Sequence, residues 1–232
     1  MPGFKPEKFL DFVSNYKGDP NQKQALLKFA GSVLAKQPEL MSDAADWVPL
    51  YRTPVSEKVT KEQLAKIWGC SPTLIKDSEV SELNRCLTTF NITTPSRKRH
   101  FLSQTAHESG GGRWKEELAS GDAYEGRKDL GNTQSGDGPR FKGAGYIQLT
   151  GRSNYTAFSN YVKDPKVMQG CSYVADNYPF SSAGFWWMSN NMNSLCDTNP
   201  TVEQVTLRVN GGYNGLDDRK MYYNRCLSVL TA

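Results

Sequence analysis

The motif HESGGG contains the residue of this 232-residue chain that best fits acid catalysis, Glu108. Thr94 is a suitable N-cap and Pro95 suits the first helical position, so we predict a helix that begins there and reaches Glu108. Phe101 and Thr105 precede Glu108 at helical spacing, so the Glu108 carboxylate lies on the same face of the helix, the face that packs on the core. Partial burial disfavours the charged form of a carboxylate, and Glu108 is therefore a candidate proton donor.

Three glycines at positions 110–112 follow this helix. Glycine ends helices, and backbone or ligand can approach it closely because it has no Cβ. We predict that the helix stops here and that a binding cleft opens beside it. Residues 113–145, which come next, are rich in charge and glycine and show little periodicity. Such a long irregular segment inside a compact domain is usually functional, although any single charge in it can be a solvated loop charge.

Helical spacing predicts most of the remaining elements. One helix follows the capping-box spacing of residues 60–63, and further helices are expected over residues 79–90, around residues 183–190, after Pro200 and from Asp218 onward. Residues 146–150 alternate like a short half-buried strand, and residues 151–155 turn away from it. The expected fold class is mainly α.

The first fifty residues carry two apolar stripes at helical spacing, separated by a Gly-Asp-Pro turn. They predict either a small helical N-terminal module or an extension that packs on the main domain. We place the boundary near residue 55, which gives residues 1–55 and a larger domain of residues 56–232.

Composition excludes several classes of function. The net charge of +4 arises from 28 basic and 24 acidic residues spread along the chain, which is too weak to indicate nucleic-acid binding. It suits either a polyanionic surface such as a bacterial wall or an ordinary solvated surface. No apolar stretch reaches the length of a membrane span, and the N-terminus lacks a signal-peptide core. We expect a monomer that is made as a soluble cytoplasmic protein and does not insert into membranes.

The cysteines and histidines do not indicate a disulfide framework, a metal site or a catalytic histidine. Five cysteines form no C-x-x-C pair, so we expect no disulfide framework. His107 is adjacent to Glu108 on a helix and points elsewhere, which favours a structural hydrogen bond over a role as base. Neither His107 nor His100 has metal-ligand spacing, and we expect no metal and no cofactor. A Ser-His-Asp hydrolase is disfavoured because no Gly-x-Ser-x-Gly motif occurs.

Four motifs in order resemble glycoside hydrolase family 19, which holds chitinases and many bacteriophage endolysins. They are AHESGG at residues 106–111, GYIQLTGRSNY at 145–155, VNGG at 209–212, and Asp218-Arg219 with Tyr222-Tyr223. The segments YEGRKDLGN at 124–132 and GDG at 136–138 are more similar to the phage and bacterial branch than to the plant branch. The resemblance covers about residues 56–232.

This resemblance implies a two-lobed, lysozyme-like domain that hydrolyses β-1,4 bonds beside N-acetylated amino sugars with inversion. Glu108 matches the general acid, and Glu117 matches the base of the bacterial members. The longer intervening segment of plant members leaves Glu125 as an alternative base. Thr150 matches the hydroxyl residue that helps to position the water. The polar residues that match the lining of the cleft are Gln148, Asn154, Asn210 and Arg219.

Two positions depart from the family pattern. Residues 143–145 read Gly-Ala-Gly where the family usually has Gly-Arg-Gly, and Asn214 replaces an acidic residue of the plant motif. The retained Glu108, Glu117 and Thr150 argue for an enzyme. Bacterial peptidoglycan is the expected substrate and chitin the alternative, while Ala144 leaves open a non-catalytic glycan-binding or virion structural relative.

The base assignment requires a particular chain path. Glu117 lies nine residues after Glu108, and on one unbroken helix the two side chains would point to opposite faces, about 13.5 Å apart along the axis. They can share a substrate only if the chain breaks at the glycines and returns. A simpler role for Glu125 is an ion pair with Arg127 or Lys128, or a contact that orders the loop.

Overall fold

The computed structural model describes Gln24, Lys28 and residues 58–230. Apart from Gln24 and Lys28, the module predicted over residues 1–55 lies outside these residues and stays a prediction. Residues 58–230 all lie within one compact unit. Its α-helices are α4 (Lys61–Trp68), α5 (Asp77–Thr89), α6 (Pro95–Glu108), α7 (Asp137–Arg140), α8 (Arg152–Val162), α9 (Cys171–Asn177), α10 (Pro179–Ser189), α11 (Met192–Cys196), α12 (Val202–Asn210) and α13 (Leu216–Val229), and its 3-10 helices are η2 (Pro72–Leu74), η3 (Asp122–Tyr124), η4 (Lys128–Leu130) and η5 (Pro165–Gln169).

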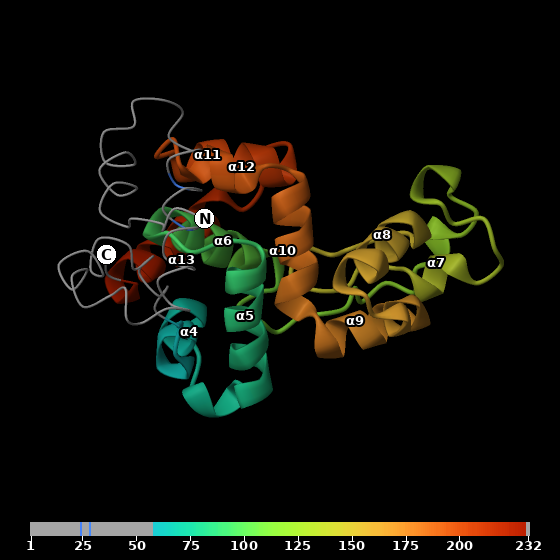
Figure 1. Cartoon of the computed structure of the whole chain (residues 1–232), viewed down its shortest axis with the longest axis horizontal. Helices are drawn as coiled ribbons and strands as arrows, with labels where there is room; N and C mark the ends of the chain where they lie inside the picture. The colour runs from blue at the N-terminus through green and yellow to red at the C-terminus, as the bar shows by residue number, and fades with distance from the viewer. Residues whose placement is uncertain (1–23, 25–27, 29–57, 231–232) are drawn as a thin grey trace, which may run out of the picture. The chain divides into compact units, whose positions relative to one another are not determined.

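Two hydrophobic cores organise this unit into two lobes. Figure 1 shows α7, α8 and α9 on one side of α10, and α4, α6 and α13 on the other. The larger core contains Phe101 of α6, whereas the smaller contains Phe141, Ala144 and Phe158. Phe185 of α10 packs against both cores. In residues 58–230 no β-sheet forms, so the mainly α, two-lobed fold class is confirmed.

Helix α6 begins and ends where the sequence predicts. The Thr94 hydroxyl accepts a hydrogen bond from the Arg97 backbone N–H at 3.3 Å, and Pro95 occupies the first turn. After Glu108 the glycines at 110–112 have φ values of 58°, 73° and 82°, which strongly disfavour other residues. A Cβ at position 112 would lie 2.5 Å from the Trp68 ring. The glycines therefore end α6 and allow the chain to pass against α4.

The strand predicted over residues 146–150 is wrong. Residues 145–148 form a turn, closed by the isolated bridge between Ala144 and Leu149. Gly145 has φ 76° and Gln148 has φ 56°, which are left-handed conformations that an extended strand does not contain. The alternation of apolar and polar residues reflects burial of Tyr146, whose hydroxyl donates to Glu79.

The turn predicted over residues 151–155 is also wrong beyond its first residue. Gly151 is the N-cap of α8, which runs on to Val162. No side chain caps this helix, and that is why the usual start signal is missing. Tyr155 and Phe158 are buried at helical spacing in the smaller core.

His100 gives the unit a titratable group in its interior. Its side chain is 1% exposed, and burial lowers the pKa of this imidazole to about 4 from an ordinary value of 6.5. Because the unfolded chain takes up this proton first, the free energy of unfolding should fall as pH drops from about 6.5 to about 4, by about 3 kcal/mol. His100→Phe keeps a ring beside Tyr223 and should lose this component, measured by denaturant unfolding of both chains across that pH range. Equal pH slopes would contradict the expectation.

Candidate active site

Glu108 lies at the last position of α6 and is held by a buried arginine. Its side chain is 26% exposed, and its Oε1 accepts a hydrogen bond from Arg219 Nη2 at 2.5 Å. Arg219 is 1% exposed and also donates through Nη1 to Gln104 and through Nε to the Asn214 carbonyl, at 3.2 Å in the second case. This ion pair therefore joins the first of the four sequence motifs, on α6, to the last one, on α13.

Glu117 is held by uncharged hydrogen-bond donors. Its Oε2 accepts a hydrogen bond from the Gly143 backbone N–H at 3.0 Å, and its Oε1 accepts one from the Tyr124 hydroxyl at 3.0 Å. Its own backbone N–H donates to the Gly143 carbonyl at 2.8 Å. The carboxylate is partly exposed, and no ion pair is formed by it in the described part of the chain.

Glu125 uses both of its oxygens to tie the loop to α7. Oε1 accepts from the Gly136 backbone N–H and Oε2 from the Gly138 backbone N–H, each at 2.8 Å. Arg127 instead pairs with Asp129, at 2.5 Å. Of the simpler roles predicted for Glu125, the contact that orders the loop is the one observed.

Of the other predicted site residues, Gln148 lies close to Glu117. A Cβ on Gly143 would lie 3.1 Å from Glu117 Oε2 and 2.3 Å from Gln148 Oε1, so these two side chains converge on Gly143. The Thr150 hydroxyl donates to the Gln148 carbonyl at 2.8 Å. Asn154 is exposed in the first turn of α8, where its Nδ2 donates to the Thr150 carbonyl at 2.8 Å.

Asn210 and His107 lie on the Glu108 side. Asn210 is exposed at the end of α12, before the turn that leads into α13. His107 Nδ1 and Asp218 Oδ2 are 2.7 Å apart, which is the structural hydrogen bond that the sequence favours. Gly215 is packed so tightly on the imidazole that a Cβ there would lie 2.0 Å from the ring.

Sequence reasoning named Arg219 but missed the partners of Glu117 and the buried partner of Arg219. The Gly143 N–H and the Tyr124 hydroxyl bind Glu117, and Gln104 completes the surroundings of Arg219. Gln104 is 0% exposed in the middle of α6, and its Nε2 donates to the Thr206 hydroxyl at 3.2 Å. A polar residue on the inner face of a helix is a signal that it has a buried partner, but the sequence does not say which one.

Two pockets lie elsewhere in the described residues, and neither is lined by Glu108, Glu117 or Glu125. A polar pocket of about 570 Å³ lies beside α5 and the start of α10, and its walls include Glu79, Arg85 and Lys115. Within the described residues no set of three His, Cys, Asp or Glu side chains is arranged to hold a metal ion. Among the same residues, no helix combines the length and apolar character of a membrane span.

No protein-family model matches the sequence of this chain. A curated relative from Haemophilus influenzae, described as a glycosyl hydrolase family 19 domain-containing protein, is 37% identical over 117 residues. The match covers 50% of this chain and 54% of the relative, so the chain spans about half the length of that relative.

Solved structures give a likeness over more of the chain. Chitinase C from Streptomyces griseus matches 74% of this chain and 76% of its own, with a TM-score of 0.58 and 17% identity. A family GH19, class IV chitinase from Zea mays matches 74% of this chain and 92% of its own, also with a TM-score of 0.58 and 17% identity. At this identity the likeness concerns the fold. In sequence over half of its length and in fold over about three quarters of it, the chain resembles glycoside hydrolase family 19, as its motifs predict.

Proposed function

We propose that the chain is an inverting glycoside hydrolase that cleaves β-1,4 bonds beside N-acetylated amino sugars. The observation that carries the proposal is the pair of partly exposed carboxylates with unlike partners. Glu108 is bound by the buried Arg219, and Glu117 is bound by the Gly143 N–H and the Tyr124 hydroxyl. Pairs of carboxyl groups in different environments are the usual arrangement for glycoside hydrolysis.

In this scheme Glu108 gives its proton to the leaving glycosidic oxygen as the bond to the anomeric carbon breaks. Arg219 then stabilises the charge left on the carboxylate, because charge-assisted hydrogen bonds are about twice as strong as neutral ones. Its guanidinium is buried, so its contribution is to position Glu108 rather than to bind sugar in this conformation.

Glu117 completes the reaction from the other face of the sugar. It removes a proton from the water that attacks the anomeric carbon, and inversion leaves room for that water when the carboxyl groups are about 6.5–9.5 Å apart. Gln148 lies next to Glu117 at Gly143, and the Thr150 hydroxyl is bonded to the Gln148 carbonyl, which suits binding of the water and of polar sugar substituents. Glu125 is a weaker candidate base because both of its oxygens are engaged by backbone N–H groups.

We further propose bacterial peptidoglycan as the substrate and a phage-type endolysin as the biological role, acting on the wall after release from the cytoplasm. Two features support this choice. The segments at 124–132 and 136–138 resemble the phage and bacterial branch, and the net charge of +4 is compatible with a polyanionic wall. Chitin is the second candidate because the two solved relatives named above are chitinases.

Dye release from purified bacterial walls and from chitin, measured side by side with the full chain, tests this proposal. We expect faster release from walls, because the loop segments at 124–132 and 136–138 resemble the phage and bacterial branch. Release from chitin alone would replace peptidoglycan by chitin. No release from either, with binding to one of them retained, would instead support the non-catalytic relative that the Gly-Ala-Gly segment around Ala144 leaves open.

A further inference from the structure

We infer that Tyr124 is a positioning residue for the base, acting through its hydroxyl on Glu117. The inference rests on the proposed function, in which Glu117 activates water. The hydroxyl reaches Glu117 Oε1 at 3.0 Å, while the Gly143 N–H reaches Oε2 at 3.0 Å. One donor on each oxygen fixes both the position and the rotation of the carboxylate plane.

Both donors are neutral, which suits a base. A cation in place of either donor would compete with the water for the charge of Glu117. Glu108, the proposed acid, does have such a cation, Arg219. A carboxylate offers about four lone-pair sites, so each oxygen of Glu117 keeps a site for water. Burial raises the pKa of the Tyr124 hydroxyl, and the hydrogen bond to Glu117 raises it further. The hydroxyl therefore stays protonated and acts as a donor.

A buried polar network holds Tyr124 itself in place. Asn132 is 0% exposed, and its Nδ2 donates to the Tyr124 carbonyl at 2.9 Å. Its Oδ1 accepts from the Arg152 backbone N–H at 2.8 Å, at the start of α8. The Arg152 side chain donates through Nε to Asp137 at 2.7 Å. The backbone of Tyr124 is therefore tied through Asn132 to the start of α8 in the smaller lobe.

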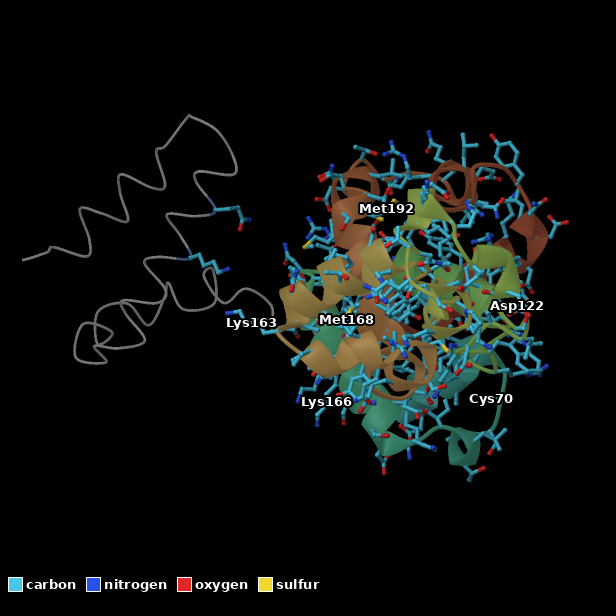
Figure 2. The ribbon with its side chains drawn as sticks, turned by 90° about the vertical axis from the view of Figure 1, so that its right-hand side faces the viewer. Cys70, Asp122, Lys163, Lys166, Met168 and Met192 are labelled. Carbon is cyan, nitrogen blue, oxygen red and sulfur yellow. The ribbon has the colours of Figure 1, made fainter. Side chains whose placement is uncertain are left out.

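Tyr124→Phe removes the hydroxyl and keeps the ring, and Tyr173→Phe is the matched control. The Tyr173 hydroxyl also donates to a carboxylate of the same lobe, Asp164 Oδ2, at 2.8 Å. Figure 2 places Lys163, the neighbour of Asp164, at the opposite edge of this lobe from Asp122, which lies in the same 3-10 turn as Tyr124. The control thus removes the same kind of bond from a carboxylate other than Glu117.

On whichever of the two proposed substrates the dye-release assay shows to be cleaved, Tyr124→Phe should lower kcat about tenfold with little change in KM, because a hydrogen bond to a charged group is lost from the base. The acidic limb of the pH profile of kcat/KM should move to higher pH, since the lost bond favoured the charged carboxylate. Tyr173→Phe should change neither. The position of the limb does not depend on how much of the protein is folded, so reduced stability alone cannot move it.

The same substitution in a Glu117→Gln background separates the possible failures. If Tyr124 acts through Glu117, it should cause no further loss of the residual rate there. Equal losses in both backgrounds, or an unchanged kcat and acidic limb in the single variant, would overturn the positioning role and leave the proposed function intact. Wild-type activity of Glu117→Gln would overturn the base assignment, and the role of Tyr124 with it.

Discussion

Glu108→Gln should leave residues 58–230 folded and lower the rate of glycan cleavage by about 10²–10⁴-fold, the usual worth of general acid catalysis. The amide is nearly isosteric with the carboxyl group but has no proton to give to the leaving oxygen. Its carbonyl oxygen can still accept the hydrogen bond from Arg219, so the buried guanidinium keeps a partner. The rate is measured by dye release, and folding by circular dichroism and thermal unfolding.

Glu203→Gln is the control for this variant. Glu203 also forms an ion pair, with Lys220, but it lies on α12 and takes no part in the proposed reaction. We expect it to keep wild-type cleavage within about twofold, because exposed ion pairs contribute little to stability. If Glu108→Gln retained more than about a tenth of the activity, the expected loss would be contradicted, and the acid would have to be another residue.

Glu117→Gln should lose activity to a similar extent, about 10²–10⁴-fold, and regain part of it when azide is added. Azide is a small anion that can replace the activated water in an inverting enzyme whose base is gone. The amide can still accept a hydrogen bond from Tyr124 or Gly143, so the loop should remain in place. The assay compares cleavage with and without azide, with product anomers or glycosyl azide identified by NMR.

Glu125→Gln is the informative comparison, because Glu125 is the alternative base. Its amide keeps one acceptor for the Gly136 and Gly138 N–H groups, so the loop should loosen while the chemistry persists. We expect a modest loss of activity without azide rescue. Azide rescue of this variant, together with an active Glu117→Gln, would move the base to Glu125.

Local signals sufficed for the elements that carry Glu108. The cap at Thr94, the spacing of Phe101 and Thr105, and the following glycines each act within a few residues of chain, and they correctly predicted where α6 begins and ends. The half-burial expected of Glu108 agrees with its 26% exposure. The family motifs likewise predicted the two-lobed helical fold, because they extend across both lobes.

The surroundings of Glu117 could not be predicted in the same way. The turn at 145–148 depends on a positive φ at Gln148, and glutamine is not a residue type from which a positive φ is predicted. The Tyr124 hydroxyl reaches back seven residues to Glu117 through an irregular loop, and that approach depends on Asn132 and on the start of α8. Tertiary contacts of this kind override the local alternation from which a strand was predicted.

The two carboxylates are held by segments that pack in different hydrophobic cores. Glu108 ends a helix packed in the larger core, whereas Glu117 is bonded to Gly143, between Phe141 and Ala144 of the smaller core. A glycan that engages both carboxylates would therefore act as a cross-link between the two lobes. Bound sugar should then slow amide hydrogen exchange in both lobes at once, including at backbone positions that touch no sugar.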